Sequence, residues 1–316
     1  MQENHGKPEN WEREVLETAL TATVVEQRRS RRWGIFFKSI FVLYILYITF
    51  LWYQGNKATP HLEDHVGLVD LVGSIGPGQE VDADHIVKSL RRAFEEPKVK
   101  AVILRINSPG GTPVQSAYIY DELVRLRKKS PDKKVYAVVA DVCASGAYYV
   151  AVGADQIYAN SSSIVGSIGV ILPGFGFVET MKKLGVEQRS IAAGKNKMFL
   201  DPFSEVKPDQ VAFAQSLLDD VHQHFIQAVR TGRAGKLKET PEIFSGLFWS
   251  GDKALELGLI DGLGSAGFVA REVIKNENIT DYTATHSLID RIAAKIGASM
   301  SKQFASELGI NQHQLK

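Results

Sequence analysis

Cysteine and an excess of charge of either sign are both scarce in this sequence. Of the 316 residues only Cys143 is a cysteine, so no disulfide can form within the chain. The 37 basic and 36 acidic residues leave a net charge of +1. Such a balance gives little attraction for polyanions, and we expect no nucleic-acid partner. Internal repeats and low-complexity segments are also absent, and the composition is that of a globular protein.

One long apolar run stands near the N-terminus, at residues 33–53, WGIFFKSIFVLYILYITFLWY. Its length matches the about 20 residues with which a helix crosses the roughly 30 Å hydrocarbon layer. RRSRR precedes it, whereas QGNKATPHLED, which follows, has one lysine. The positive-inside rule therefore predicts a cytoplasmic N-terminus and an exported remainder. No A-x-A pattern follows Tyr53, which favours an uncleaved anchor over a signal peptide, and a buried core helix is the third interpretation.

This run divides the chain into four expected parts. We expect a cytoplasmic tail at 1–32, the membrane anchor at 33–53, a linker at 54–65 and one exported domain at 66–316. In the domain, apolar strand-like segments alternate with helical patterns, which predicts an α/β fold with a largely parallel sheet. The expected strands lie at 66–75, 100–107, 134–141, around 163–171 and at 186–192, and a long helix is expected at 208–230.

A serine stands where the third apolar segment gives way to a helical pattern, in DVCASGAYYVAVGAD (residues 141–155). In an open α/β sheet, reactive groups gather at the carboxyl ends of strands, where the first N–H groups of a helix lack partners. Ser145 is therefore either an N-cap or a nucleophile with the Gly146 N–H beside it. The pattern alone favours the cap, because serine is a preferred N-cap residue. Cys143 is a rival nucleophile, but its place in an apolar strand favours a small buried residue.

The preceding strand ends in INSPGG, residues 106–111. Gly110 and Gly111 let the backbone approach a bound group and offer N–H donors, as an oxyanion hole requires. A plain strand-to-helix turn, in which Pro109 fixes its own φ, explains the motif equally well.

A serine nucleophile needs a base, and the sequence has no histidine between His85 and His222. We expect the histidines on either side of this gap to be solvated: His61, His65, His85, His222 and His224. A lysine can replace histidine as the base if burial lowers the pKa of its amine. Lys195 and Lys197, in GKNKMFLDPF (residues 194–203), are the candidates, and an ordinary surface charge is the alternative for each.

Five motifs follow one another in a fixed order: INSPGG, DVCASGAYYVAVGAD, GSIGV, GKNK with DPF, and SGDKALELGLIDGLG. In this order they resemble signal peptide peptidase A in its short, single-repeat bacterial form, over about residues 66–265. INSPGG and the serine turn also resemble the Clp protease and crotonase superfamily, which shares the fold. The resemblance implies Clp/crotonase-like layered β-sheets with covering helices, preceded by one transmembrane helix, with no cofactor and no metal.

The resemblance further implies a Ser/Lys dyad. The serine that matches the family's nucleophile is Ser145. The matching lysine is Lys197 rather than Lys195, because it stands three residues after a glycine and shortly before a proline. Met198 and Cys143 depart from the family's pattern, although neither removes a catalytic atom.

The remaining parts of the implied site are a second serine and two backbone amides. Ser167, in GSIG, matches the family's serine that hydrogen-bonds the lysine amine and orients it. The N–H groups of Gly111 and Gly146 would hold the oxyanion of the tetrahedral intermediate. Acyl transfer to Ser145, with Lys197 as the base, is the reaction that this set implies.

The favoured interpretation is a serine endopeptidase anchored in the bacterial inner membrane, with its N-terminus cytoplasmic and its protease domain periplasmic. By resemblance it degrades hydrophobic peptides such as cleaved signal peptides. The resemblance also implies a homo-oligomer, such as an octamer, in which one subunit supplies the lysine to its neighbour's serine. The alternatives are a catalytically silent membrane scaffold or peptide-binding protein on the same fold, and a Clp-like or crotonase-like enzyme. The lack of a histidine soon after Ser145 disfavours a Clp-like triad, and the exported location disfavours acyl-CoA chemistry.

Overall fold

The computed structural model describes residues 11–55 and 63–284, and these two ranges belong to two separate compact units. In the first unit, α1 (Trp11–Gly55) is one continuous helix of 45 residues. Within the described residues, α1 is the one helix long and apolar enough to cross a membrane, over Val24–Leu51. Its apolar side chains between Trp33 and Leu51 are exposed, so α1 has no core of its own. Residues 11–32 of the expected tail thus belong to the same helix as the expected anchor.

The second unit is built from short strands and helices that alternate along the chain. Its elements are β1 (His65–Val72), α2 (Ala83–Glu95), β2 (Val99–Ser108), α3 (Pro113–Lys129), β3 (Lys134–Ala144), α4 (Gly146–Ala151), β4 (Gln156–Ala159), β5 (Ile164–Gly166), α5 (Val178–Leu184), α6 (Pro208–Gly232), η1 (Pro241–Phe244), β6 (Phe248–Ser250), α7 (Gly251–Glu256), β7 (Gly262–Leu263), α8 (Ala266–Phe268), the π-helical η2 (Val269–Ile274) and β8 (Ile279–Asp281).

One mostly parallel sheet organises this unit. Its main path runs in the order β6-β5-β3-β2-β1-β8, and β4 and β7 extend a branch from β3. All pairs are parallel except β5 with β6. The central strands carry near-continuous runs such as AVIL in β2, whose side chains are buried on both faces. The expected α/β fold with a largely parallel sheet is therefore confirmed.

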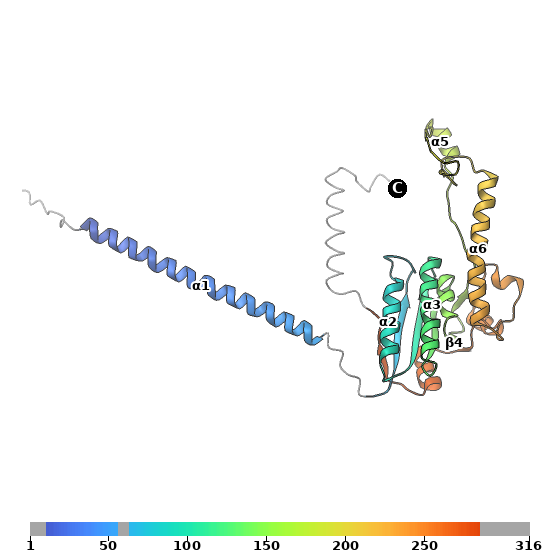
Figure 1. Ribbon diagram of the computed structural model, residues 1–316, viewed down its shortest axis with the longest axis horizontal. Helices are drawn as coiled ribbons and strands as arrows, with labels where there is room; N and C mark the ends of the chain where they lie inside the picture. The colour runs from blue at the N-terminus through green and yellow to red at the C-terminus, as the bar shows by residue number, and fades with distance from the viewer. Residues whose placement is uncertain (1–10, 56–62, 285–316) are drawn as a thin grey trace, which may run out of the picture. The chain divides into compact units, whose positions relative to one another are not determined.

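Helices α2 and α3 lie side by side against one face of the sheet (Figure 1). They bury a large apolar cluster against it, to which Leu90 of α2 and Leu123 of α3 contribute. A second, smaller cluster includes Val66 and Val138 from the strands together with Val269 of η2. The chain after α6 thus packs back on the sheet, as expected, and it also supplies β6, β7 and β8 to it.

A long arm, residues 169–207, follows β5 and contains α5. Figure 1 shows α5 beyond the N-terminal end of α6, away from α2 and α3. Helix α5 ends just before the segment 186–192, for which the expected strand is wrong, because this segment has no regular structure. The arm exposes many large apolar side chains: Ile171, Leu172, Phe175, Phe177, Leu184, Val186, Ile191, Phe203 and Val206.

Candidate active site

Ser145 forms a sharp turn between β3 and α4. Its backbone has φ 51° and ψ −125°, a conformation that residues other than glycine rarely adopt. Its side chain makes no capping hydrogen bond, so the N-cap interpretation that the pattern favoured is wrong. Two backbone hydrogen bonds hold the turn, from Ser145 N–H to the carbonyl of Gly166 (2.8 Å) and from Tyr149 N–H to the carbonyl of Ser145 (3.0 Å). A strained residue kept by its surroundings is typical of functional sites.

The glycine loop that follows β2 lies directly against this turn. Gly110 has φ 100°, and a Cβ placed on it would lie 2.9 Å from the Cβ of Ser145 and 2.7 Å from the Gly146 nitrogen. On its other side the loop is fixed to Ile75, whose N–H donates to Gly110 and whose carbonyl accepts from Thr112 N–H, each at 2.9 Å. Only glycine allows the loop to approach Ser145 this closely.

Two backbone amides meet beside the serine. A Cβ placed on Gly146 would lie 3.2 Å from the nitrogen of Gly111. In the part of the chain that the structure describes, the Gly111 N–H donates no hydrogen bond, and Gly146 is the first residue of α4, where helical N–H groups lack a carbonyl partner within the helix. Paired amides next to a hydroxyl are the donors that stabilise an oxyanion.

Ser167 lies at the end of the neighbouring strand β5. Ala144 pairs with Gly166 across β3 and β5, so Ser145 and Ser167 follow directly after paired residues. Ser167 also has a positive φ, 53°, and its N–H donates to the carbonyl of Leu247 at 2.7 Å. The fold therefore brings four of the five predicted site residues to one edge of the sheet.

The fifth residue, Lys197, lies on the arm. Its side chain is exposed, as is that of Lys195, and its N–H donates to the Gly194 carbonyl in a local turn (3.0 Å). Among the described residues, no hydrogen bond or ion pair joins Lys197 to Ser145 or Ser167. The fold of a single chain thus brings the serines and the amides together, while the described contacts of Lys197 do not join it to them.

His222 of α6 is a site neighbour that the sequence did not indicate. It is half-buried rather than solvated, and its Nε2 lies 3.1 Å from the carbonyl oxygen of Ile168, to which it donates. Ile168 follows Ser167 directly, so His222 fixes the turn that carries this serine. Helical spacing gave no signal for this contact, because its partner is a backbone carbonyl 54 residues away.

Two further side chains bear on the sequence predictions. Cys143 is fully buried in β3, and burial raises the pKa of its thiol, so it is not a thiolate nucleophile, in agreement with the prediction. His65, expected to be solvated, is buried instead, because it is the first residue of β1 and lies 2.8 Å from the hydroxyl of Tyr282. His61 lies outside the described residues.

Within the described residues, no group of three or more His, Cys, Asp or Glu side chains could hold a metal ion.

Known proteins match part of this chain. Residues 127–280 match Peptidase family S49. A protein of Synechocystis named as a protease is 37% identical over 200 residues, which cover 63% of this chain and 70% of that protein. The chain belongs to peptidase family S49. Signal peptide peptidase SppA of Enterococcus faecium, also similar to this S49 chain, is 29% identical over 205 residues, 65% of this chain and 59% of that one.

A longer relative matches more strongly over a shorter region. The Na(+)/H(+) antiporter NhaA of Brucella melitensis is 50% identical over 175 residues, 55% of this chain. The match covers 24% of that protein, so the S49 chain spans about a quarter of its length. Among solved structures, a mutant of the 1510-N membrane-bound stomatin-specific protease with a substrate peptide aligns with a TM-score of 0.42 at 15% identity, over 75% of this chain and 99% of that one.

Proposed function

We propose that this S49 chain is a serine endopeptidase whose nucleophile is Ser145. The observation that carries the proposal is the strained turn at Ser145, which sits beside the amides of Gly111 and Gly146. A hydroxyl on such a turn, without a capping bond, is exposed to attack a carbonyl whose oxygen the two amides can receive. Membership of a peptidase family supports the same reaction.

The proposed reaction is acyl transfer with Lys197 as the base. The neutral amine of Lys197 takes the proton of the Ser145 hydroxyl while the Ser145 oxygen forms a bond to the peptide carbonyl carbon. The carbonyl oxygen becomes an oxyanion on the N–H groups of Gly111 and Gly146, each of which is worth about 3 kcal/mol in such sites. The C–N bond then breaks, and Lys197 returns the proton to the leaving amine. A water molecule, deprotonated by the Lys197 amine, then attacks the acyl carbon. The ester C–O bond breaks, and Lys197 returns the proton to the Ser145 oxygen, while Ser167 orients Lys197 throughout.

The base would come from a second copy of the chain. The support is that Lys197 lies on the arm without a contact to Ser145, while the arm exposes apolar side chains such as Phe175 and Ile191. Many large apolar side chains exposed on one segment are typical of an interaction site. We therefore propose a closed homo-oligomer in which each arm reaches the serine of its neighbour, an octamer by resemblance.

The proposed substrates are hydrophobic peptides close to a membrane, such as cleaved signal peptides. Helix α1 supports membrane anchoring, because Val24–Leu51 is long and apolar enough to span a bilayer. The arginines of residues 28–32 favour an N-terminus in the cytoplasm and a protease domain in the periplasm, at the bacterial inner membrane. The name of the Enterococcus relative, a signal peptide peptidase, points to the same substrate class.

The decisive test is peptide cleavage by the full chain in detergent. Wild type, Ser145→Ala, Lys197→Ala and Lys195→Ala would be compared on a leucine-rich peptide from about pH 6 to about pH 10. We expect Ser145→Ala and Lys197→Ala to lose at least about 1000-fold in kcat, as loss of a catalytic dyad member does. Lys195→Ala is the matched control and should stay active, because its side chain is equally exposed two residues away.

The pH profile separates the proposed base from other groups. Only a neutral amine can accept the proton, so the wild-type rate should rise with pH. Cleavage that persists in Ser145→Ala would contradict the proposal. So would a folded wild type that cleaves nothing at any pH, which is the result that a catalytically silent scaffold predicts.

A further inference from the structure

Tyr148 stands one helical turn after Ser145, on α4, and its side chain is fully buried. Its hydroxyl donates a hydrogen bond of 2.7 Å to the backbone carbonyl of Leu259, 111 residues further along the chain. Burial raises the pKa of this hydroxyl, which therefore stays a proton donor. The helix that begins beside the nucleophile is thus tied by this hydrogen bond to a distant loop.

That loop, residues 257–261, is fixed by several backbone contacts. Leu259 N–H donates to the carbonyl of Ala254 (2.8 Å), and Lys238 N–H donates to that of Leu257 (2.9 Å). Gly258 has φ 74°, and a Cβ there would collide with the carbonyl oxygen of Lys236. The loop and the chain that follows α6 are therefore packed backbone to backbone.

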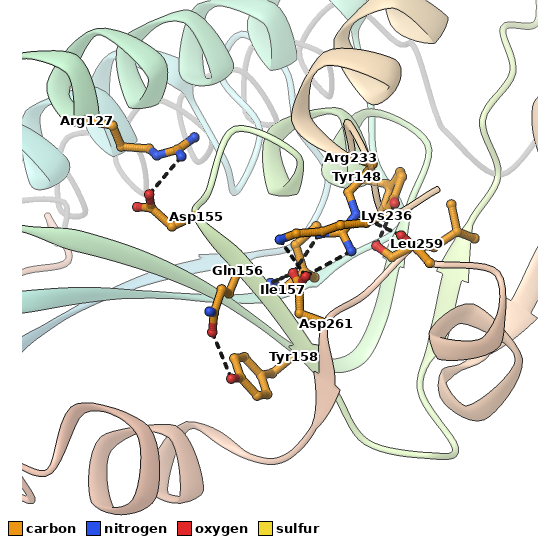
Figure 2. Close-up of polar contacts among 11 residues, drawn as sticks. Arg127, Tyr148, Asp155, Gln156, Ile157, Tyr158, Arg233, Lys236, Leu259 and Asp261 are labelled. Carbon is orange, nitrogen blue, oxygen red and sulfur yellow. Dashed lines mark hydrogen bonds and ion pairs between the residues drawn. The ribbon is translucent and has the colours of Figure 1, made fainter. Parts of the chain in front are cut away.

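An ion pair between Arg233 and Asp261 holds the same loop (Figure 2). Arg233 is 1% exposed, and its Nε donates to the carbonyl of Gly258 at 2.9 Å. Its two terminal nitrogens donate to the carboxylate of Asp261 at 2.6 and 3.2 Å, and Ile157 N–H donates to one of the same oxygens at 2.7 Å. Asp261 is desolvated, which opposes its ionisation, but the hydrogen bonds from Arg233 and Lys236 lower its pKa overall.

Helix α6, which leads to Arg233, also contacts α4 directly. A Cβ on Gly232 would collide with the carbonyl oxygen of Val152, so the end of α6 lies against the end of α4. The rings of Tyr149 and Phe225 pack 5.0 Å apart between the same helices. These contacts are apolar or steric, whereas the Tyr148 hydroxyl gives α4 a directional bond.

We propose that Tyr148, held by Leu259 and the buried Arg233–Asp261 pair, is a positioning residue that sets the place of the Gly146 amide beside Ser145. The inference rests on the proposed function and deepens it. Ser145 keeps its strained backbone only where neighbouring elements fix both sides of the turn. On the strand side these are β3 and β5, and on the helix side the tie is Tyr148. A misplacement of about 1 Å in such a site can cost about 100-fold in rate.

The test is Tyr148→Phe in the full chain, which removes one hydroxyl and leaves the ring. We expect kcat for the leucine-rich peptide to fall about 10-fold with KM unchanged, because the amide acts on the transition state and not on the bound substrate. The midpoint of thermal unfolding should fall by only about 2–4 °C. Tyr149→Phe is the matched control, since no hydrogen bond of its hydroxyl is found in the described part of the chain, and it should keep the wild-type kcat.

A second pair of variants acts on the ion pair. Asp261→Asn weakens the support of the Leu259 carbonyl and should lower kcat in the same way, with KM unchanged. Lys236→Gln removes only the outer partner of Asp261, at 2.7 Å and 43% exposed, and should have little effect on kcat. If Tyr148→Phe does not fold, the Asp261→Asn result decides.

The outcomes separate this inference from the proposed function. Wild-type cleavage that Ser145→Ala abolishes supports the proposed function by itself. With that result in hand, a wild-type kcat in both Tyr148→Phe and Asp261→Asn overturns the positioning role alone. So does a loss that lies entirely in KM, or in the folded fraction. A wild type that does not cleave, or a Ser145→Ala variant that does, overturns both.

Discussion

Two serines, Ser145 and Ser167, have positive φ where the site is built. A residue other than glycine held in such a region costs about 1–3 kcal/mol, which the folded state must offset elsewhere. Both stand directly after paired residues of β3 and β5, so the strain is concentrated at one edge of the sheet. The two strained residues are thus the serines whose side chains have proposed roles in the reaction.

Replacing Ser145 by glycine should therefore stabilise the protein while it abolishes cleavage. Glycine adopts φ 51° without strain, and we expect Ser145→Gly to raise the free energy of unfolding by about 1 kcal/mol relative to Ser145→Ala. Ser145→Ala is the control, because alanine keeps the strain and also lacks the hydroxyl. Thermal unfolding of the full chain in detergent measures the difference. Equal midpoints for the two variants would show that the turn stores no strain.

At the scale of elements, α2 and α3 are joined by a carboxylate that two arginines share. Glu122 of α3 accepts from Arg91 of α2 at 2.7 Å and from Arg125 at 2.6 and 2.8 Å, and its side chain is 8% exposed. The hydrogen bond from Arg125, opposed by burial and reinforced by Arg91, lowers the pKa of Glu122 from 4.5 to about 2. The ionised form is thus favoured in the folded state.

The ionised Glu122 should make the stability of the domain depend on pH. Because the pKa of Glu122 is lower in the folded state, its contribution is complete above about pH 4.5 and is lost as the pH falls toward about 2. We expect Glu122→Gln to cost about 1–2 kcal/mol at pH 7 and to converge with the wild type as the pH approaches 2. Unfolding by denaturant across this range measures it. Glu239→Gln, which removes an exposed pair with Arg230, should change far less, and a constant gap at all pH values would contradict the assignment.

At the scale of the whole molecule, the position of Lys197 on the arm leads to a complementation test. Ser145→Ala and Lys197→Ala chains would be produced together and purified by separate tags on each. If the base comes from a neighbouring copy, random assembly in a closed ring leaves roughly a quarter of the sites complete, and the mixture should regain about that share of activity. Each variant alone is the control. A mixed assembly without activity would place the whole dyad within one chain and contradict the shared site.

The sequence predicted the elements whose apolar residues form a recognisable pattern. The long helix at 208–230 follows from regular apolar spacing, and the three central strands follow from near-continuous apolar runs. The glycines of INSPGG marked a close approach of backbones. Strands β4, β7 and β8 are two to four residues long and carry no pattern of their own. The segment at 186–192 has apolar residues such as Val186 and Ile191, but no strand lies beside it in the described chain.

The polar contacts of the site escaped prediction for a different reason. His222 meets a carbonyl 54 residues away, and Arg233 meets Asp261 28 residues away, beyond η1, β6 and α7. A buried polar pair is specified by the fold that surrounds it, and neither partner shows in sequence where the other will lie. Ser145 could be singled out from the residues because its strand, turn and helix are adjacent in the chain. Lys197 was selected only by resemblance. Its place on the arm, two residues from the equally charged Lys195, explains why it was difficult to choose from the residues alone.

The unbroken course of α1 has a mechanical consequence in the proposed membrane orientation. At 1.5 Å per residue its 45 residues extend about 68 Å, roughly twice the hydrocarbon layer. Because α1 has no hinge, its N-terminal end has the same tilt as its membrane segment. The part of α1 before Trp33 extends about 33 Å, so a tilt of about 20°, ordinary for a spanning helix, would displace the N-terminal end sideways by about 10 Å from the point where the helix leaves the bilayer. A change in bilayer thickness would thereby be converted into a lateral movement in the cytoplasm.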